Sequence, residues 1–269
     1  MKLFAVLLPL ICFFGYAFAN DNATAVLHDL VPDTIITNGY PAYEGKAPYI
    51  VSLNFRRDGN NALTLCSGSI IANNWVLTAA HCIHDKHYVE IHYGSNWRWN
   101  GQYNLVVRHN NFVRHPQWPH IQGNDIGLIR TPHVNFNDRV NRIRLPLLSQ
   151  RNDLMENWWA LACGWGRQAD GQLADWLQCI DETIMSNHEC SRTYWDIPIG
   201  VLCLRTPGGR STCGGDSGSP LVITNDNPIL VGVASFFPGA GCTSGAPAGF
   251  TRVTAHLDWI RQHSGVAYY

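Results

Sequence analysis

The segment Ser211-Thr212-Cys213-Gly214-Gly215-Asp216-Ser217-Gly218-Ser219-Pro220 sets Ser217 between an aspartate and a glycine, close to a glycine pair and a cysteine. Glycines around a serine leave its hydroxyl accessible and let backbone N–H groups approach a reacting carbonyl. A serine hydroxyl is a weak nucleophile unless a neighbouring base takes its proton. The segment therefore predicts that a base, and a group that orients it, lie elsewhere in the chain.

Both partners are present upstream of this segment. His81 lies in Val76-Leu77-Thr78-Ala79-Ala80-His81-Cys82, and Asp125 lies in Asn124-Asp125-Ile126-Gly127-Leu128-Ile129. With twelve histidines in the chain, an ordinary structural role for His81 is the alternative, as is a turn or capping role for Asp125. The apolar run before His81 and the apolar run after Asp125 favour catalysis, because each would anchor its neighbour on a buried strand.

The order His81, Asp125, Ser217 is the order found in chymotrypsin. At these residues the sequence resembles the trypsin/chymotrypsin family of serine proteases, from about Ile36 to the C-terminus. Within that family, the stretches 36–46 and 244–250 resemble the Jonah-type digestive proteases of insects. The resemblance implies two antiparallel β-barrels with the active site in the cleft between them and a C-terminal helix.

The residue pattern by itself indicates an all-β protein. Short β-rich runs such as Tyr49–Phe55 and Trp75–Thr78 alternate with turns rich in Gly, Asn and Pro. One helix is predicted, over Val253–His263, because Val253, Leu257 and Ile260 recur at helical spacing.

The N-terminus predicts an exported protein. Residues 1–19 have a basic start, an apolar run and a small-residue end, which is typical of a signal peptide cleaved after Ala19. A membrane anchor is the alternative, but the run is short for a span and contains Pro9. Residues 20–35 are predicted to form a propeptide carrying a glycosylation sequon at Asn22, and residues 36–269 the peptidase domain.

The composition excludes several kinds of partner. The net charge of −1 and the scarcity of charged residues, 14% of the chain, give no basis for binding nucleic acid or an anionic membrane. We expect a secreted, extracellular monomer without a cofactor, whose partners are protein or peptide substrates and protein protease inhibitors.

Eight cysteines remain after the predicted signal peptide. An even number in an exported chain predicts disulfides, and eight cysteines allow 105 pairings. The family resemblance implies the pairs Cys66–Cys82, Cys190–Cys203 and Cys213–Cys242, and leaves Cys163 with Cys179.

The resemblance also implies a role for each site residue. His81 would be the general base, Asp125 a buried carboxylate that orients it, and Ser217 the nucleophile. The backbone N–H groups of Gly215 and Ser217 would form the oxyanion hole.

Activation in the family uses a new amino terminus that pairs with an aspartate. Here Ile36 and Asp216 occupy the two positions, and Ile35 stands where the family carries Arg or Lys before the cleaved bond. We therefore predict activation by an enzyme that prefers aliphatic residues, or by the protein itself.

The specificity pocket is predicted to include Ser211, Phe237 and Ala248. A neutral Ser211 on the pocket floor cannot offset the desolvation of a cation, which argues against substrate Arg or Lys. Large apolar side chains are the chymotrypsin-like alternative. A phenylalanine at position 237 could instead fill the pocket and select small side chains. Ser219 replaces a glycine of the family motif, and would be strained if its backbone needed a glycine-only conformation.

Two other classes of function compete with this interpretation. The chain could be a catalytically silent protease homologue that acts as a binding module. It could also bind a metal through His81, His84 and His87, although no standard ligand spacing is present and no metal is predicted.

Overall fold

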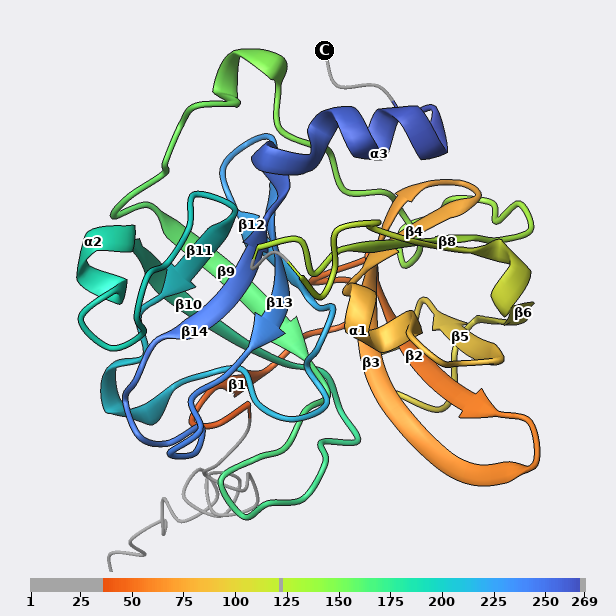
Figure 1. The fold of residues 1–269 in the computed structure, drawn as a ribbon. Helices are drawn as coiled ribbons and strands as arrows, with labels where there is room; N and C mark the ends of the chain where they lie inside the picture. Colours follow the sequence, from red (N-terminus) through yellow and green to blue (C-terminus); the bar gives the residue numbers. More distant parts are fainter. Residues whose placement is uncertain (1–35, 121–122, 267–269) are drawn as a thin grey trace, which may run out of the picture. The chain divides into compact units, whose positions relative to one another are not determined.

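The computed structural model describes residues 36–120 and 123–266, which belong to the second of two compact units of the chain, residues 34–269. The predicted signal peptide and propeptide, with Asn22 and Ile35, lie outside the described residues. Strands dominate the described part, and they form two antiparallel sheets (Figure 1).

The first sheet is built from strands of the N-terminal half, in the order β6-β5-β2-β3-β4-β8-β7. Its strands are β2 (Ile50–Arg57), β3 (Asn60–Ala72), β4 (Trp75–Thr78), β5 (Tyr88–Tyr93), β6 (Tyr103–Arg108), β7 (Phe112–Arg114) and β8 (Gly127–Arg130). The edge strands β6 and β7 are joined by the 3₁₀ turn η1 (His109–Asn111). Because only three residues separate the two edges, the sheet must curl back on itself.

The second sheet closes completely. Its strands are β1 (Tyr40–Pro41), β9 (Trp159–Gly164), β10 (Gln178–Met185), β11 (Val201–Leu204), β12 (Pro220–Ile223), β13 (Ile229–Phe236) and β14 (Ala248–Arg252). Since β10 pairs with both β11 and β9, six strands form a closed barrel, and β1 is added at β10. The predicted all-β architecture of two antiparallel halves is confirmed. The halves differ in closure, because in the first a short connection, not strand pairing, joins the edges.

Side-chain alternation explains the first sheet. Val51, Leu53 and Phe55 on β2 are fully buried and lie opposite Tyr93, Ile91 and Val89 on β5, which are buried as well. Every second residue of each strand therefore points into one apolar core, as the pleat of a strand requires.

The predicted C-terminal helix is present as two consecutive pieces. A 3₁₀ turn, η4 (Val253–His256), leads into α3 (Leu257–Ser264), and the three predicted apolar residues are fully buried. Gly265 ends α3 in the left-handed conformation, and its N–H donates to the carbonyl of Arg261. Within residues 36–120 and 123–266, no helix is long and apolar enough to cross a bilayer.

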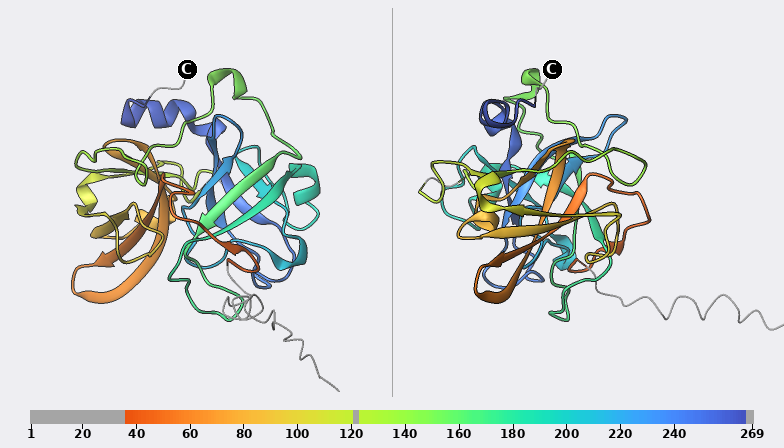
Figure 2. Two further views of the ribbon diagram at one scale, coloured as in Figure 1. Left: turned by 180° about the vertical axis from the view of Figure 1, so that it is seen from behind. Right: turned by 90° about the vertical axis from the view of Figure 1, so that its right-hand side faces the viewer.

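Several short turns of helix were not predicted from the sequence. They are α1 (Ala80–Ile83), α2 (Asn187–Cys190), η2 (Leu148–Gln150) and η3 (Pro207–Gly209). Each is too short to show helical periodicity. Figure 2 lets the reader follow these connections from two further directions.

Four disulfides join the eight cysteines of the described residues. The pairs are Cys66–Cys82, Cys163–Cys179, Cys190–Cys203 and Cys213–Cys242. Three of them are the pairs that the family resemblance implied, and Cys163–Cys179 is the pair that was left by elimination. The first fixes α1 against β3, and the last joins the Ser217 segment to the loop after β13.

Candidate active site

His81 is positioned by the end of a buried strand. All four residues of β4 are buried, Ala79 and Ala80 are fully buried, and α1 begins there. Cys82 is tied to β3 through its disulfide with Cys66. The His81 side chain itself is about one-third exposed, so the surrounding chain is fixed while the imidazole reaches solvent.

Asp125 contacts His81 through both of its carboxylate oxygens. The backbone N–H of His81 donates to Oδ1 at 2.9 Å, and His81 Nδ1 lies 2.7 Å from Oδ2. A carboxylate accepts a hydrogen bond here, so Nδ1 carries the proton and Nε2 of the neutral imidazole is an acceptor. The Cys82 sulfur lies 3.7 Å from Nε2 but is in a disulfide and has no proton to donate. The His81–Asp125 pair therefore provides a proton acceptor on the far side of the ring from Asp125.

The second sheet also holds Asp125. The hydroxyl of Ser235 on β13 donates to Oδ2 at 2.7 Å, and the hydroxyl of Thr251 on β14 donates to the Asp125 carbonyl at 2.8 Å. Sequence reasoning did not single out these two residues. They lie 110 and 126 positions away from Asp125, and no local pattern marks them.

The segment before Asp125 is anchored to η4, at the start of α3. Nε2 of His256 lies 2.9 Å from Oδ1 of Asn124, and the His256 ring packs edge-on against His115. Burial, with a further contribution from His256 and His263, lowers the pKa of His115 to about 4. Burial also lowers the pKa of His256, although its hydrogen bond to the Arg252 carbonyl opposes this. Both imidazoles are therefore neutral near pH 7.

Ser217 lies in a turn that crosses between the two sheets. Its carbonyl accepts a hydrogen bond from the N–H of Ser67 on β3, at 2.8 Å, and the next residue donates to the carbonyl of Ala234 on β13. No hydrogen bond links the Ser217 hydroxyl to His81 within the part of the chain that the structure describes. Such contacts are often long without substrate and shorten in the reacting complex.

Gly218 is required at its position. Its φ is +80°, and a Cβ there would lie 2.2 Å from Oγ1 of Thr78 and 2.3 Å from the carbonyl oxygen of Ser67. Only glycine allows the Ser217 turn to lie this close to the end of β4.

The amides near Ser217 divide into two groups. The N–H groups of Asp216 and Ser219 donate to the carbonyls of Cys213 and Asp216. Those of Gly215 and Ser217 have no acceptor among the described residues. Gly215 has φ +104°, and a Cβ there would lie 2.9 Å from Leu173. The two amides predicted to bind an oxyanion are thus available.

Asp216 is fully buried. Its carboxylate accepts hydrogen bonds from the N–H of Gly166 at 2.7 Å and of Cys213 at 2.9 Å. Burial raises the pKa of Asp216 to about 6, against the effect of these two hydrogen bonds. No cation lies within ion-pair distance of it in residues 36–120 and 123–266.

Ile36 is also buried, and the residues after it contact the segment before Asp216. The Thr37 hydroxyl donates to the Ser211 carbonyl, and the Asn38 amide donates to the Gly208 carbonyl. The φ of Ile36 is +27°, which is strained for a β-branched residue.

Of the three residues predicted for the specificity pocket, Phe237 lines a small cavity next to Ser217. A cavity of about 10 Å³ lies beside Ser217, and its lining includes Ser235, Phe236 and Phe237. Ser211 and Ala248 are fully buried and do not line this cavity. A Cβ on Gly214 would lie 3.9 Å from Cζ of Phe237, so the Phe237 ring reaches across the mouth toward the Ser217 segment.

The Phe236 ring, which also lines the cavity, packs on residues of the second sheet and its loops. It packs edge-on against Tyr194, with centroids 5.2 Å apart, and occupies the space beside Gly249. A Cβ on Gly249 would lie 2.1 Å from that ring, so Gly249 is what admits the phenylalanine.

Ser219 is not strained. Ser219 is not one of the described non-glycine residues that have a positive φ. Its backbone therefore needs no glycine-only conformation. Its hydroxyl is buried and has no hydrogen-bond partner among the described residues.

The predicted alternative of a metal site is poorly supported by the donors present. Atoms of Cys66, His81 and Cys82 lie within 4.8 Å of one another, but the two sulfurs are joined in a disulfide and are not thiolate ligands. His84 Nδ1 faces the guanidinium of Arg114.

Comparison with known proteins gives a consistent result. The family profile described as "Trypsin" matches residues 36–260. Serine protease 1 of Drosophila melanogaster is 52% identical over 235 residues, which are 87% of either chain. Collagenase of Hypoderma lineatum is 39% identical over 239 residues, covering 87% of this chain and 88% of the relative. A solved structure of HL collagenase matches with a TM-score of 0.80 and 38% identity, over 86% of this chain and 99% of that one.

The close approach at Gly218 generates a test of the site's packing. Gly218→Ala should lower the free energy of unfolding by about 2 kcal/mol or more, because the new Cβ combines an unfavourable φ with overlap. Gly239→Ala is the matched control, since a Cβ there meets nothing within 4 Å. Urea denaturation of both variants measures the difference, and equal stabilities would contradict the packing described.

Proposed function

Because this chain belongs to the trypsin family and is a serine endopeptidase, we propose that Ser217, His81 and Asp125 form its catalytic triad. The observation that carries the proposal is the contact of His81 Nδ1 with Asp125, at 2.7 Å, which in the neutral imidazole places the proton on Nδ1 and leaves Nε2 able to accept one.

The proposed reaction follows from that arrangement. The Ser217 hydroxyl attacks the carbonyl carbon of the peptide bond while His81 Nε2 takes its proton. The carbonyl oxygen becomes negative, and the free amides of Gly215 and Ser217 donate to it. His81 returns the proton to the leaving amine, and an acyl group remains on Ser217. Water then repeats the sequence and releases the acid.

Asp125 has a distinct role in this scheme. It fixes the tautomer of His81 and offsets the charge of the imidazolium that forms. The hydroxyl of Ser235 helps to hold the carboxylate in place, which restricts its rotation between catalytic cycles.

We propose that the chain is made as a zymogen and cleaved before Ile36. A buried carboxylate without a cationic partner is costly, and the free ammonium of Ile36 would supply that partner to Asp216. The burial of Ile36, its strained φ of +27° and the anchoring of residues 37 and 38 beside Ser211 support the proposal.

We further propose that the enzyme prefers a small, uncharged side chain before the cleaved bond. The cavity beside Ser217, about 10 Å³, has room for roughly one water molecule, and the Phe237 ring lies across its mouth. A large aromatic substrate side chain would have to displace that ring.

We propose that the enzyme is secreted and acts outside the cell. Four disulfides fit an oxidising, extracellular compartment, and residues 1–19 supply the export signal. A role in digestion rests on the resemblance to Jonah-type proteases alone.

Substitution of Ser217 tests the triad. Ser217→Ala should abolish labelling by a serine-directed phosphonate and lower kcat/KM by at least about 10⁴-fold, because no alcohol is left to acylate. Ser219→Ala, two residues away and buried, is the matched control and should keep both. A wild type that neither labels nor turns over would favour the silent-homologue alternative.

Activation has a test that is sensitive to pH. N-terminal sequencing of the active form should give Ile36, and Asp216→Asn should be cleaved there without gaining activity. Pairing raises the pKa of the new amino group above its ordinary value of about 7.7–8.0. The ammonium's contribution to the active conformation is therefore fully present below that value, while Asp216 is ionised, and is lost as the pH rises through the raised pKa. An active form beginning elsewhere would refute the proposal.

Pocket size is tested by removing one ring. Phe237→Gly should raise kcat/KM for substrates with Phe before the cleaved bond, relative to Ala, by about tenfold or more, because the ring would no longer close the mouth. Tyr43→Gly removes an exposed aromatic ring elsewhere and is the control. An unchanged preference would count against Phe237 as the determinant.

A further inference from the structure

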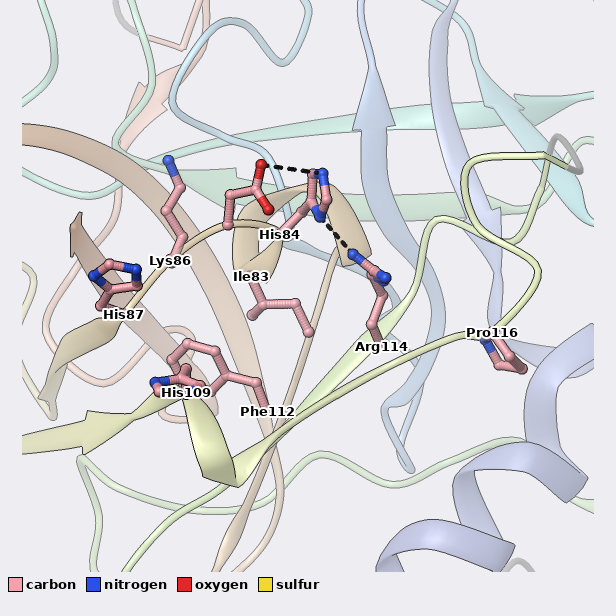
Figure 3. A pocket seen from close by; sticks show the side chains of 9 residues that line it. Ile83, His84, Lys86, His87, His109, Phe112, Arg114 and Pro116 are labelled. Atoms are coloured by element: carbon pink, nitrogen blue, oxygen red, sulfur yellow. Dashed lines mark hydrogen bonds and ion pairs between the residues drawn. The ribbon is translucent and has the colours of Figure 1, made fainter. Parts of the chain in front are cut away.

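A second and larger cavity lies beyond α1. Its volume is about 520 Å³, within the range of ligand sites. We call it the basic pocket. Residues that define it include Ile83, His84, Lys86, His109, Phe112 and Arg114 (Figure 3).

The floor of the basic pocket is apolar. Ile83 is buried, and Phe112 packs edge-on against Phe55 of the first core, with ring centroids 5.9 Å apart. Figure 3 shows Ile83 and Phe112 between Lys86 and His87 on one side and Arg114 on the other. The pocket therefore offers apolar surface flanked by basic groups.

The only carboxylate that lines the pocket within the described residues, Asp85, already has partners. The guanidinium of Arg114 is always a donor, so His84 Nδ1 accepts from it and the ring proton lies on Nε2. That Nε2 lies 3.4 Å from Asp85, and Arg57 lies 3.7 Å from the same carboxylate oxygen. The negative charge of Asp85 is thus directed to His84 and Arg57.

A backbone hydrogen bond determines which nitrogen of the His87 ring is unprotonated. The N–H of Asp58 donates to Nδ1 of His87 at 2.8 Å, which requires an unprotonated Nδ1. The Asp58 carboxylate approaches the same atom at 3.4 Å, but the shorter backbone contact determines the tautomer.

Two cations of the pocket have no carboxylate within 4 Å in residues 36–120 and 123–266. Lys86 donates to the hydroxyl of Thr64 at 2.8 Å, and Arg114 contacts His84 and lies over the Trp118 ring at 5.5 Å. Burial and the nearby Arg57 lower the pKa of Lys86, which Asp85 opposes only in part. A bound anion would offset the repulsion between Lys86 and Arg57.

The basic pocket adjoins the site described above. Ile83 follows His81 by two residues on α1, and the His84 ring packs edge-on against Trp118 at 5.0 Å. Trp118 belongs to the segment that leads to Asp125. A protein substrate bound at Ser217 and His81 could therefore extend a nearby stretch of chain into the pocket.

We propose that the basic pocket binds an acidic segment of the protein substrate, with an apolar side chain on Ile83 and Phe112 and carboxylates toward Lys86 and Arg114. The proposal rests on the endopeptidase function proposed above. One inorganic anion could not contact cations on both sides of an apolar floor. In an extended peptide, every second side chain lies on one face, so the pattern acid-x-apolar-x-acid matches the pocket.

Peptide binding to an inactive variant tests the proposed role of the basic pocket without catalysis. The probe is fluorescein-labelled Asp-Ser-Phe-Ser-Asp, titrated into the full chain carrying Ser217→Ala and followed by anisotropy. Asn-Ser-Phe-Ser-Asn is the neutral control peptide. The acidic peptide should bind more tightly, and added salt should weaken it.

Paired variants localise the effect. Lys86→Gln with Arg114→Gln should raise Kd for the acidic peptide by about two- to fivefold for each cation removed. Arg142→Gln with Arg144→Gln makes the same change of charge at a different groove, beside the end of α3, and should leave Kd unchanged. Thermal denaturation checks that all variants are folded.

The outcomes separate this proposal from the previous one. Equal binding of the two peptides, an unchanged Kd in the Lys86/Arg114 pair, or an equal loss in the Arg142/Arg144 pair would overturn the basic pocket as the site. None of these results bears on Ser217, whose role is decided by labelling and turnover. In the wild type, a substrate extended by the acidic segment should show a higher kcat/KM than one extended by the neutral segment.

Discussion

The carboxylate of Asp125 is the group on which both sheets converge. It accepts from the backbone and ring of His81, which lies in α1 directly after β4 of the first sheet, and from the hydroxyl of Ser235 on β13 of the second. Hydrogen bonds to an ionised group are among the stronger ones in proteins. Since Thr251 also binds its carbonyl, any sliding of one sheet against the other would break several such bonds at once. The geometry at His81 is therefore fixed by the packing of the whole domain.

Around Asp216 and Ser217, glycines allow parts of the chain to approach one another closely. Gly164 and Gly166 leave space for Asp216, since a Cβ on either would lie within 2.3 Å of one of its carboxylate oxygens. Gly218 lets the Ser217 turn approach Thr78. The Asp216 carboxylate is held in that space by hydrogen bonds from Gly166 and Cys213. The order of this region therefore depends on hydrogen bonds as well as on packing.

Local sequence was sufficient for the features that depend on neighbours in the chain. The strand before His81 and the helical spacing of Leu257 and Ile260 in α3 each predicted an element that the structure has. The contact of Ser235 with Asp125 could not be predicted, because it joins residues 110 positions apart. The same holds for the reach of the Phe237 ring toward Gly214, which depends on how two loops meet. Closure of only one sheet by strand pairing also has no signature in the pattern of alternating residues.

The short strand β1 constrains how far a newly freed chain end could travel. Tyr40 and Pro41 pair with Cys179 and Gln178 on β10, so a cut before Ile36 would leave a tether of four residues. Such a tether spans at most about 14 Å. An amino group joined to β1 by so short a segment has a high effective concentration near that strand. Binding of this amino group to Asp216 would then depend little on its intrinsic affinity. Cleavage of one peptide bond would therefore convert nearly all of the chain to the bound form.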